Sequence, residues 1–194
     1  YVQNPAKSAA VNFDGLTSVE AIDANAWHVG SASSPDYTDG GLRVSDGKLS
    51  FFNAADGSVI SSKEKFQNFV LQFDVPYIER EGQEDDDGNI TRTVSTWIGL
   101  TFGMESAETL FSAENQKMIY MGPGTIDLLN AKFDDGSTRI WAPQDLWNMD
   151  FAGKTVTVRL VAKDNSLSLA YRVEGEDESV LDTPKAVISN IDTY

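Results

Sequence analysis

The sequence predicts an all-β protein built as an antiparallel β-sandwich or jelly roll. Four segments alternate apolar and polar residues with the period of two expected of a strand with one buried face: 69–77, 94–102, 155–162 and 167–173. Other short apolar runs are separated by Gly, Asp and Asn turn signals at intervals of roughly eight to twelve residues, which is typical of a sandwich. The best helix candidate, residues 105–115, is short. The pattern therefore favours two antiparallel sheets around one core.

The N-terminal third is expected to contain several short strands. Residues 1–9 include Asn4-Pro5 and show no periodicity, so we expect a leader or linker there and a single domain over residues 10–194. Asp46-Gly47 stands between two apolar runs and is a strong hairpin signal. The strands expected in this part of the chain are 10–13, 27–30, 42–44, 48–52 and 58–62.

The middle of the chain carries the clearest strand pattern. In residues 69–77 every second residue is apolar, and residues 94–102 resume this alternation after the acidic loop 79–89. We expect these two strands to pair as one long antiparallel hairpin, because the loop between them is too polar to be buried. The side of the second strand that faces away from the core is expected to carry Ser95, Trp97, Gly99 and Thr101.

The C-terminal half predicts five further strands. Residues 117–121 and 125–130 are separated by a Gly-Pro-Gly break. An Asp164-Asn165 turn joins two well-patterned strands into a second hairpin, and residues 186–194 supply the last strand.

Composition excludes several classes of function. The 194 residues carry a net charge of −15, so nucleic acids and anionic membranes would repel the chain. The absence of Cys excludes disulfides and thiol chemistry, and the single His28 argues against a multi-histidine metal site or a Ser–His triad. No apolar run approaches the roughly 18 residues of a membrane span. The chain begins at Tyr1 without an initiator Met, from which we expect part of a larger, multidomain protein.

Several short motifs follow one another in an order that resembles a known superfamily. They are Asn12-Phe13-Asp14-Gly15-Leu16, Trp27, Asp46 to Phe51, Ile60-Ser61-Ser62, Phe66 to Val75, and Ile191-Asp192-Thr193-Tyr194. In these motifs the chain resembles the concanavalin A-like lectin/glucanase superfamily. Within it, the chain is similar to the laminin-G-like and family-16 glucanase-like jelly rolls, and to the 3-keto-glycoside hydrolase domain family.

This resemblance implies a concanavalin A-like, two-sheet antiparallel jelly roll in which sugars lie across the concave sheet. By order along the chain, the concave sheet would hold residues 69–77, 94–102, 117–121 and 125–130. The second hairpin and the last strand would lie in the convex sheet. A secreted or cell-surface location is expected on the same grounds.

The sequence favours binding over catalysis. Glucanases of this superfamily carry alternating Glu, Asp and Glu on one strand, which sets the acid and the nucleophile about 5 Å apart. The strand expected to correspond, Lys117 to Met121, contains no carboxylate, and the acidic cluster from Glu79 to Asp87 lies on a predicted hairpin tip. A glycoside-active enzyme with a carboxylate pair elsewhere, and a ligand-free adhesin or spacer module, remain as alternatives.

Candidate sugar-binding residues follow from the expected concave face. Saccharide sites stack sugar rings on aromatic faces and add a few amide, carboxylate or Arg hydrogen bonds. Trp97 would be the platform, with Gly99 and Thr101 leaving room beside it, although a Trp can equally pack under a loop or between the sheets. The full set of predicted ligand-binding residues is Gln72, Asp74, Trp97, Tyr120, Trp141 and Trp147. We therefore expect a non-catalytic, lectin-like module whose partner is a glycan or polysaccharide.

The resemblance also implies a structural Ca²⁺ where the first and last strands meet. In the family this ion is held by backbone carbonyls and one Asp of the final strand. The matching positions here are Gly15, Gly47 and Asp192. The acidic run Asp85–Asn89 lacks the spaced ligands and distal Glu of a calcium loop and is interpreted as a turn.

Overall fold

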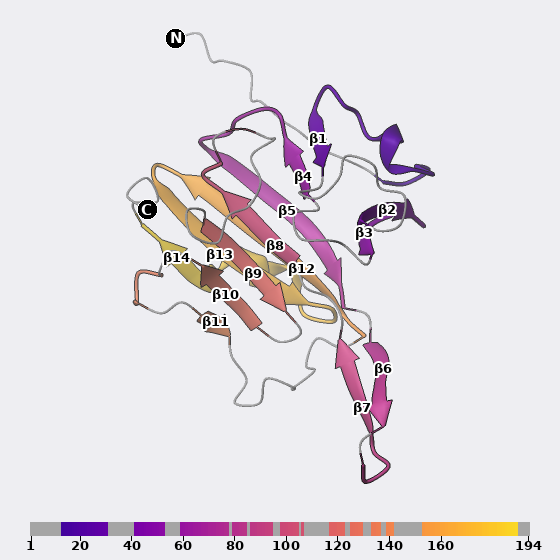
Figure 1. The fold of residues 1–194 in the computed structure, drawn as a ribbon. Helices are drawn as coiled ribbons and strands as arrows, with labels where there is room; N and C mark the ends of the chain where they lie inside the picture. Colours follow the sequence, from indigo (N-terminus) through magenta and orange to yellow (C-terminus); the bar gives the residue numbers. More distant parts are fainter. Residues whose placement is uncertain are drawn as a thin grey trace, which may run out of the picture. The chain divides into compact units, whose positions relative to one another are not determined.

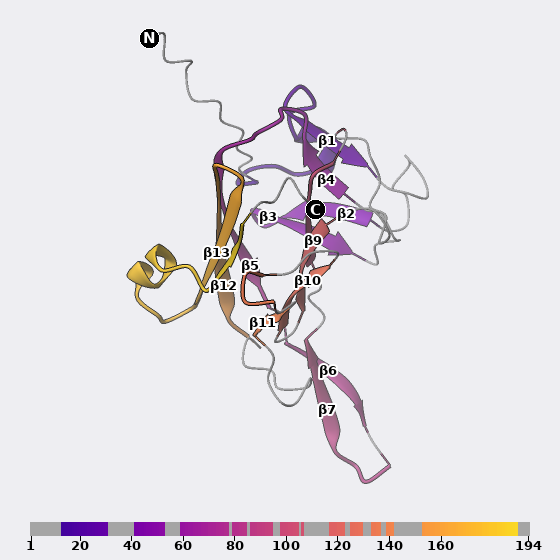
Figure 2. The same ribbon diagram turned by 90° about the vertical axis from the view of Figure 1, so that its left-hand side faces the viewer.

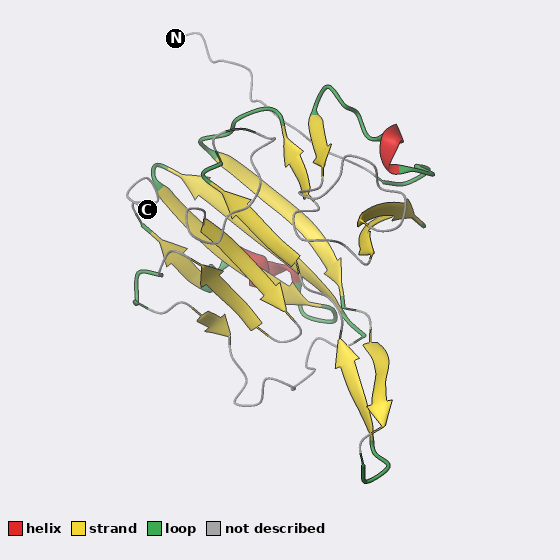
Figure 3. Cartoon of the chain, in the orientation of Figure 1, coloured by secondary structure: helices red, strands yellow, loops and turns green. Residues whose placement is uncertain are grey.

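The structure, a computed structural model, confirms the all-β prediction. It describes residues 13–30, 41–52, 59–77, 79–84, 86–94, 98–104, 106, 117–122, 125–129, 133–136, 139–141 and 153–189. Within these ranges the regular structure consists of antiparallel strands and two short 3₁₀ turns (Figure 3). Apart from Ser106, the expected helix 105–115 lies outside the described residues.

The chain forms two compact units, and each is defined by its own contacts. The N-terminal unit comprises residues 1–66 and 104–112, and the sandwich unit comprises residues 67–103 and 113–194. The proposed leader 1–9 lies outside the described residues. A single domain over residues 10–194 stays a prediction.

The N-terminal unit contains two antiparallel strand pairs, β1 with β4 and β2 with β3. Asp46 and Gly47 have φ angles of 51° and 69°, and positive φ at both central residues is what a type I′ hairpin turn requires. The predicted hairpin at Asp46-Gly47 is therefore confirmed. The elements of this unit are η1 Val19–Ala21, β1 Trp27–Gly30, β2 Gly41–Ser45, β3 Lys48–Phe52 and β4 Val59–Ser62.

The sandwich unit contains two four-stranded antiparallel sheets (Figure 1). One sheet has the strand order β14-β13-β12-β5 and the other β11-β10-β9-β8. The first sheet is made of β5 Phe69–Pro76, β12 Thr155–Lys163, β13 Ser166–Val173 and β14 Ala186–Ile188. The second is made of β8 Ile98–Phe102, β9 Lys117–Gly122, β10 Thr125–Leu129 and β11 Arg139–Trp141.

One hydrophobic core joins these two sheets, which face each other in Figure 2. Strand β12 contributes most to the core because every second residue from Val156 to Ala162 points inward and is at most 2% exposed. Ile119 of β9 and Leu128 of β10 approach from the opposite sheet. Burial of apolar surface contributes roughly 25 cal/mol per Å², so this core is the main source of stability for the unit.

The expected long hairpin between residues 69–77 and 94–102 is wrong. Strand β5 pairs with β12 over its whole length, and β8 pairs with β9. Both segments alternate with the same period, and alternation alone does not choose between partners that offer equal apolar faces. Residues 79–94 instead form their own hairpin of β6 Glu79–Glu84 and β7 Ile90–Val94.

One strand lies in a different sheet from the one predicted. Strands β8, β9 and β10 lie together in one sheet, and β12, β13 and β14 in the other, as expected. Strand β5 was expected beside β8, but it belongs with β12, where Leu71 faces Leu160 and Phe73 faces Val158. This apolar pairing explains the placement, because it extends the core of the longest strand pair in the unit.

Tyr77 generates a prediction about pH. Its side chain is 2% exposed, and burial raises the pKa of the phenol above its ordinary value. In the unfolded chain the Tyr77 phenol loses its proton near pH ~10, whereas in the folded chain it keeps this proton. The free energy of unfolding should therefore fall above about pH 10, by at most ~1.4 kcal/mol per pH unit. Tyr77→Phe should remove most of this loss in urea unfolding measured near pH ~8 and ~11.

A matched control is Tyr171→Phe. Tyr171 is only partly buried; burial, followed by the charge of Glu176, raises its pKa in the same direction. This variant should leave most of the pH dependence in place. Equal alkaline destabilisation of the parent and of Tyr77→Phe would contradict the assignment.

Candidate functional site

The outward face of β5 and β12 carries a row of polar side chains. Because β5 alternates, its inward residues are apolar while Val70, Gln72 and Asp74 are exposed. The strand register sets Gln72 directly beside Arg159 and Asp74 beside Thr157. The same alternation that builds the core therefore lines up amide, carboxylate, hydroxyl and guanidinium groups on the other side of the sheet.

Thr157 is the centre of one hydrogen-bond chain on this face. Its hydroxyl donates to Asp74 Oδ1 at 2.7 Å and accepts from Arg172 Nη2 at 3.3 Å. Thr157 is buried, with 5% of its surface exposed. Arg172 Nε is also buried and has no hydrogen-bond partner in the described part of the chain. The Thr157 hydroxyl is therefore important for holding this guanidinium.

Arg159 links the sheet to the segment that follows β13. Its Nε donates to Gln72 Oε1 at 2.9 Å, and its Nη1 donates to Asp182 Oδ1 at 3.0 Å. The side chain of Arg159 is 23% exposed and that of Asp182 is 75% exposed. Solvent screens such a pair, so we assign it at most about 1 kcal/mol of stability and regard it chiefly as a positioning contact.

Asp182 is the last residue of η2, Glu178–Asp182, which packs on the outward face of β13 (Figure 2). Asp177 caps this turn by accepting from Ser179 N at 2.9 Å and Ser179 Oγ at 2.6 Å, and these bonds lower the pKa of its carboxyl. Leu181 is 3% exposed and anchors the turn beside Ala170 of β13. The sequence of η2 therefore fixes Asp182 in front of Arg159.

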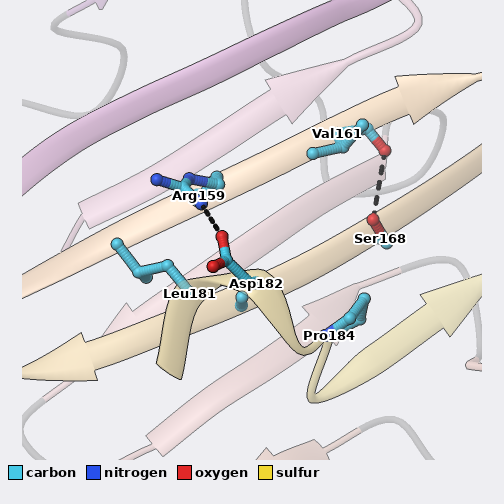
Figure 4. A pocket seen from close by; sticks show the side chains of 7 residues that line it. Arg159, Val161, Ser168, Leu181, Asp182 and Pro184 are labelled. Carbon is cyan, nitrogen blue, oxygen red and sulfur yellow. Dashed lines mark hydrogen bonds and ion pairs between the residues drawn. The ribbon is translucent and has the colours of Figure 1, made fainter. Parts of the chain in front are cut away.

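A pocket of about 220 Å³ lies between η2 and the sheet (Figure 4). Its apolar lining comes from Val161, Ala170, Leu181 and Pro184, and its polar lining from Arg159, Ser168 and Asp182. Ser168 Oγ donates to Val161 O at 3.5 Å, the long limit of a hydrogen bond. Typical small-molecule pockets measure about 300–1,000 Å³, so this one suits a single small group.

The polar groups of the pocket offer complementary hydrogen bonding. A guanidinium only donates and a carboxylate only accepts, whereas a serine hydroxyl does both. Arg159, Asp182 and Ser168 together therefore match a ligand that accepts and donates at neighbouring positions. The apolar side chains beside them match a C–H surface on the same ligand.

The predicted ligand-binding residues are divided between the two sheets. Gln72 and Asp74 lie on the polar face described above, in the sheet of β12. Tyr120 and Trp141 belong to the other sheet, where the backbone of Tyr120 pairs with Gly99 and Asp127 and that of Trp141 with Ile126. The side chains of Tyr120 and Trp141 are not among those described, and Trp97 and Trp147 lie outside the described residues. The expectation that Gln72 and Asp74 adjoin the strand of Trp97 is wrong because β5 pairs with β12.

The expected open space on β8 is partly taken by a methionine. Gly99 is exposed and Thr101 is partly buried. A Cβ at Gly99 would collide with Sδ of Met118, so the glycine allows this thioether to lie over the strand. The outward surface of β8 is therefore more apolar than the sequence alone indicated.

The sequence patterns did not single out the three polar residues of this pocket, Arg159, Ser168 and Asp182. Arg159 could have been found, because it alternates with the apolar residues of β12 and is the one charged side chain in the middle of that strand. Asp182 belongs to an aperiodic segment after β13, so no pattern in the sequence predicts its place beside Arg159.

Two of the three predicted calcium positions lie within the N-terminal unit. Gly15 and Gly47 both have positive φ, and Asp14 Oδ1 lies 2.6 Å from where a Cβ of Gly47 would be. Asp192 lies outside the described residues. Within the described ranges, no group of three or more His, Cys, Asp or Glu side chains is arranged to hold a metal ion.

Comparisons with known proteins give no relative for the chain. No protein-family model matches it, and neither a curated protein nor a solved structure does. Among the residues that the structure describes, none belongs to a helix with the length and hydrophobicity of a membrane span.

The Thr157 chain of hydrogen bonds generates a prediction about stability. Thr157→Val keeps the shape of the side chain but removes the hydroxyl that accepts from Arg172 Nη2. The Nε of the same guanidinium is already buried without a partner among the described residues. Leaving such a donor unsatisfied costs about 1–3 kcal/mol, which urea unfolding resolves. Thr157→Ser keeps the hydroxyl and should retain most of the stability. A valine variant as stable as the parent would show that the hydroxyl is dispensable.

Proposed function

We propose that the chain is a non-catalytic, lectin-like carbohydrate-binding module with a concanavalin A-like jelly-roll fold. The observation that carries the proposal is the pocket in which Arg159 and Asp182 stand beside apolar side chains. Gln72, one of the residues that the sequence singled out for sugar binding, accepts a hydrogen bond from the same guanidinium.

The chemistry of sugars supports this choice of ligand. A sugar ring presents hydroxyls that both donate and accept, next to patches of C–H surface. An Arg–Asp pair with apolar neighbours matches this combination. The net charge of −15 also favours an uncharged ligand over a polyanion.

The wider setting of the module is part of the same proposal. The order of short motifs that resembles concanavalin A-like domains supports a secreted or cell-surface location, and a larger multidomain parent stays a prediction. Four of the predicted sugar-binding residues stay predictions: Trp97, Tyr120, Trp141 and Trp147.

We also propose a structural Ca²⁺ at the turns of the N-terminal unit. The Asp14 carboxylate beside Gly47 adds a hard oxygen donor to the backbone carbonyls expected at Gly15 and Gly47, and Ca²⁺ prefers such oxygens. The predicted contribution of Asp192, which lies outside the described residues, stays a prediction. Bound Ca²⁺ would stabilise this unit and take no part in the sugar contacts proposed above.

Calcium binding predicts a change in melting temperature. An ion that binds only the folded state stabilises by about 3 kcal/mol at a hundredfold excess over its dissociation constant. Chelator should lower the melting temperature, and Asp14→Asn should remove most of the difference. Magnesium serves as the control, because it keeps its waters and should restore little. Identical melting curves with calcium and with chelator would exclude the ion.

The sugar-binding proposal is tested with a glycan array followed by titration calorimetry. Arg159→Gln should weaken binding of the best glycan by about tenfold or more, because hydrogen bonds to charged groups contribute roughly 1.5–3 kcal/mol. Lys163→Gln is the matched control: it removes a cation from the same strand, and Lys163 is exposed outside the pocket.

Two results would contradict the proposal. The first is an array on which the parent protein binds no glycan. The second is an Arg159→Gln variant that binds as tightly as the parent at matched melting temperature, because the pocket that carries the proposal would then take no part in binding.

A further inference from the structure

We infer that, if the chain binds carbohydrate as proposed, the pocket holds the terminal residue of a glycan as one neutral ring, bound through two adjacent hydroxyls. The inference specifies the ligand of the Arg159–Asp182 pocket and rests on the proposed function. Three features of the pocket support it: its size, its walls and the arrangement of its charges.

The size of the pocket limits the ligand to a single unit. Its volume of about 220 Å³ is below the range of about 300–1,000 Å³ for pockets that enclose drug-sized molecules. A volume of this order matches one sugar ring, with the remainder of the glycan outside.

The walls of the pocket are fixed in place. The segment that carries η2 begins where Val173 N donates to Glu176 Oε2 at 2.7 Å, and it ends where Lys185 N donates to Leu169 O at 2.8 Å. Leu181 is buried between these ties. Because the segment is held at both ends and Leu181 is buried between them, Asp182 keeps its position in front of Arg159.

The remaining hydrogen-bonding atoms form an adjacent donor and acceptor. Arg159 uses Nε for Gln72 and Nη1 for Asp182, so among the described residues its Nη2 stays available as a donor. Asp182 uses Oδ1 for this bond, which leaves Oδ2 as an acceptor. Two hydroxyls on neighbouring ring carbons match this arrangement, one accepting from Arg159 and the other donating to Asp182.

Charge selects a neutral ring over an acidic one. A sugar carboxylate that approached Arg159 would also approach Asp182, which is 75% exposed at the rim of the pocket. Two like charges this close repel each other, and the net charge of −15 adds to the repulsion. We therefore expect the pocket to bind uronic acids more weakly than neutral sugars.

The test uses the whole chain labelled with ¹⁵N, the glycan best bound on the array, and methyl glycosides of mannose, glucose, galactose, N-acetylglucosamine and fucose. The glycoside that corresponds to the terminal sugar should displace the glycan completely, and glucuronate should not displace it. Amide shift changes should gather at residues 159–170 and 181–185.

Asp182→Ala should weaken binding by about tenfold or more. Glu178→Ala, which removes a carboxylate from the same turn, should leave binding unchanged.

The outcomes separate this inference from the function on which it rests. Binding that requires longer oligosaccharides, or that is equal in the two alanine variants with unchanged spectra, overturns the terminal-ring inference and leaves carbohydrate binding in place. Displacement by glucuronate overturns the neutral-ring part. An array without any bound glycan overturns both the inference and the proposed function.

Discussion

The pairing of β12 on both of its edges is the interaction on which the sandwich unit depends. Its register runs from Thr155 opposite Pro76 to Ala162 opposite Phe69 on one side, and from Val156 opposite Val173 to Lys163 opposite Ser166 on the other. The two hydrogen-bond ladders pair the backbone N–H and C=O groups of β12, the most buried strand. They also hold three apolar rows side by side against β9 and β10. The fold and the outward polar face both follow from this one register.

The same register determines the chemistry of the outward face. A shift of one residue would turn Arg159 and Thr157 inward, where an unpaired charge costs far more than the hydrogen bonds that they now make. Burial of the inner row therefore fixes which polar groups meet outside, Gln72 with Arg159 and Asp74 with Thr157. The exposed ion pair of Arg159 and Asp182 adds little stability, so its value lies in orienting the two groups for a ligand.

Strand positions and tight turns could be predicted from the sequence, because both are local. Alternation located β5, β12 and β13, and Asp46-Gly47 and Asp164-Asn165 form turns with the positive φ angles that such residues tolerate. The partners of β5 and β8 could not be predicted, since these two strands offer similar apolar faces and the choice depends on the whole core. Asp182 could not be predicted either, because its position depends on Leu181 docking on a sheet assembled from distant strands.

The most direct test of this account is the pairing of β5, measured as nuclear Overhauser contacts between backbone protons of neighbouring strands. The register predicts contacts between Gln72 and Arg159, and between Asp74 and Thr157. These contacts would place the predicted sugar-binding amide beside the guanidinium of the pocket. Contacts from residues 70–74 to residues 98–102 would instead contradict the account, because β5 would then pair with β8 and the polar face of β12 would lose its partner strand.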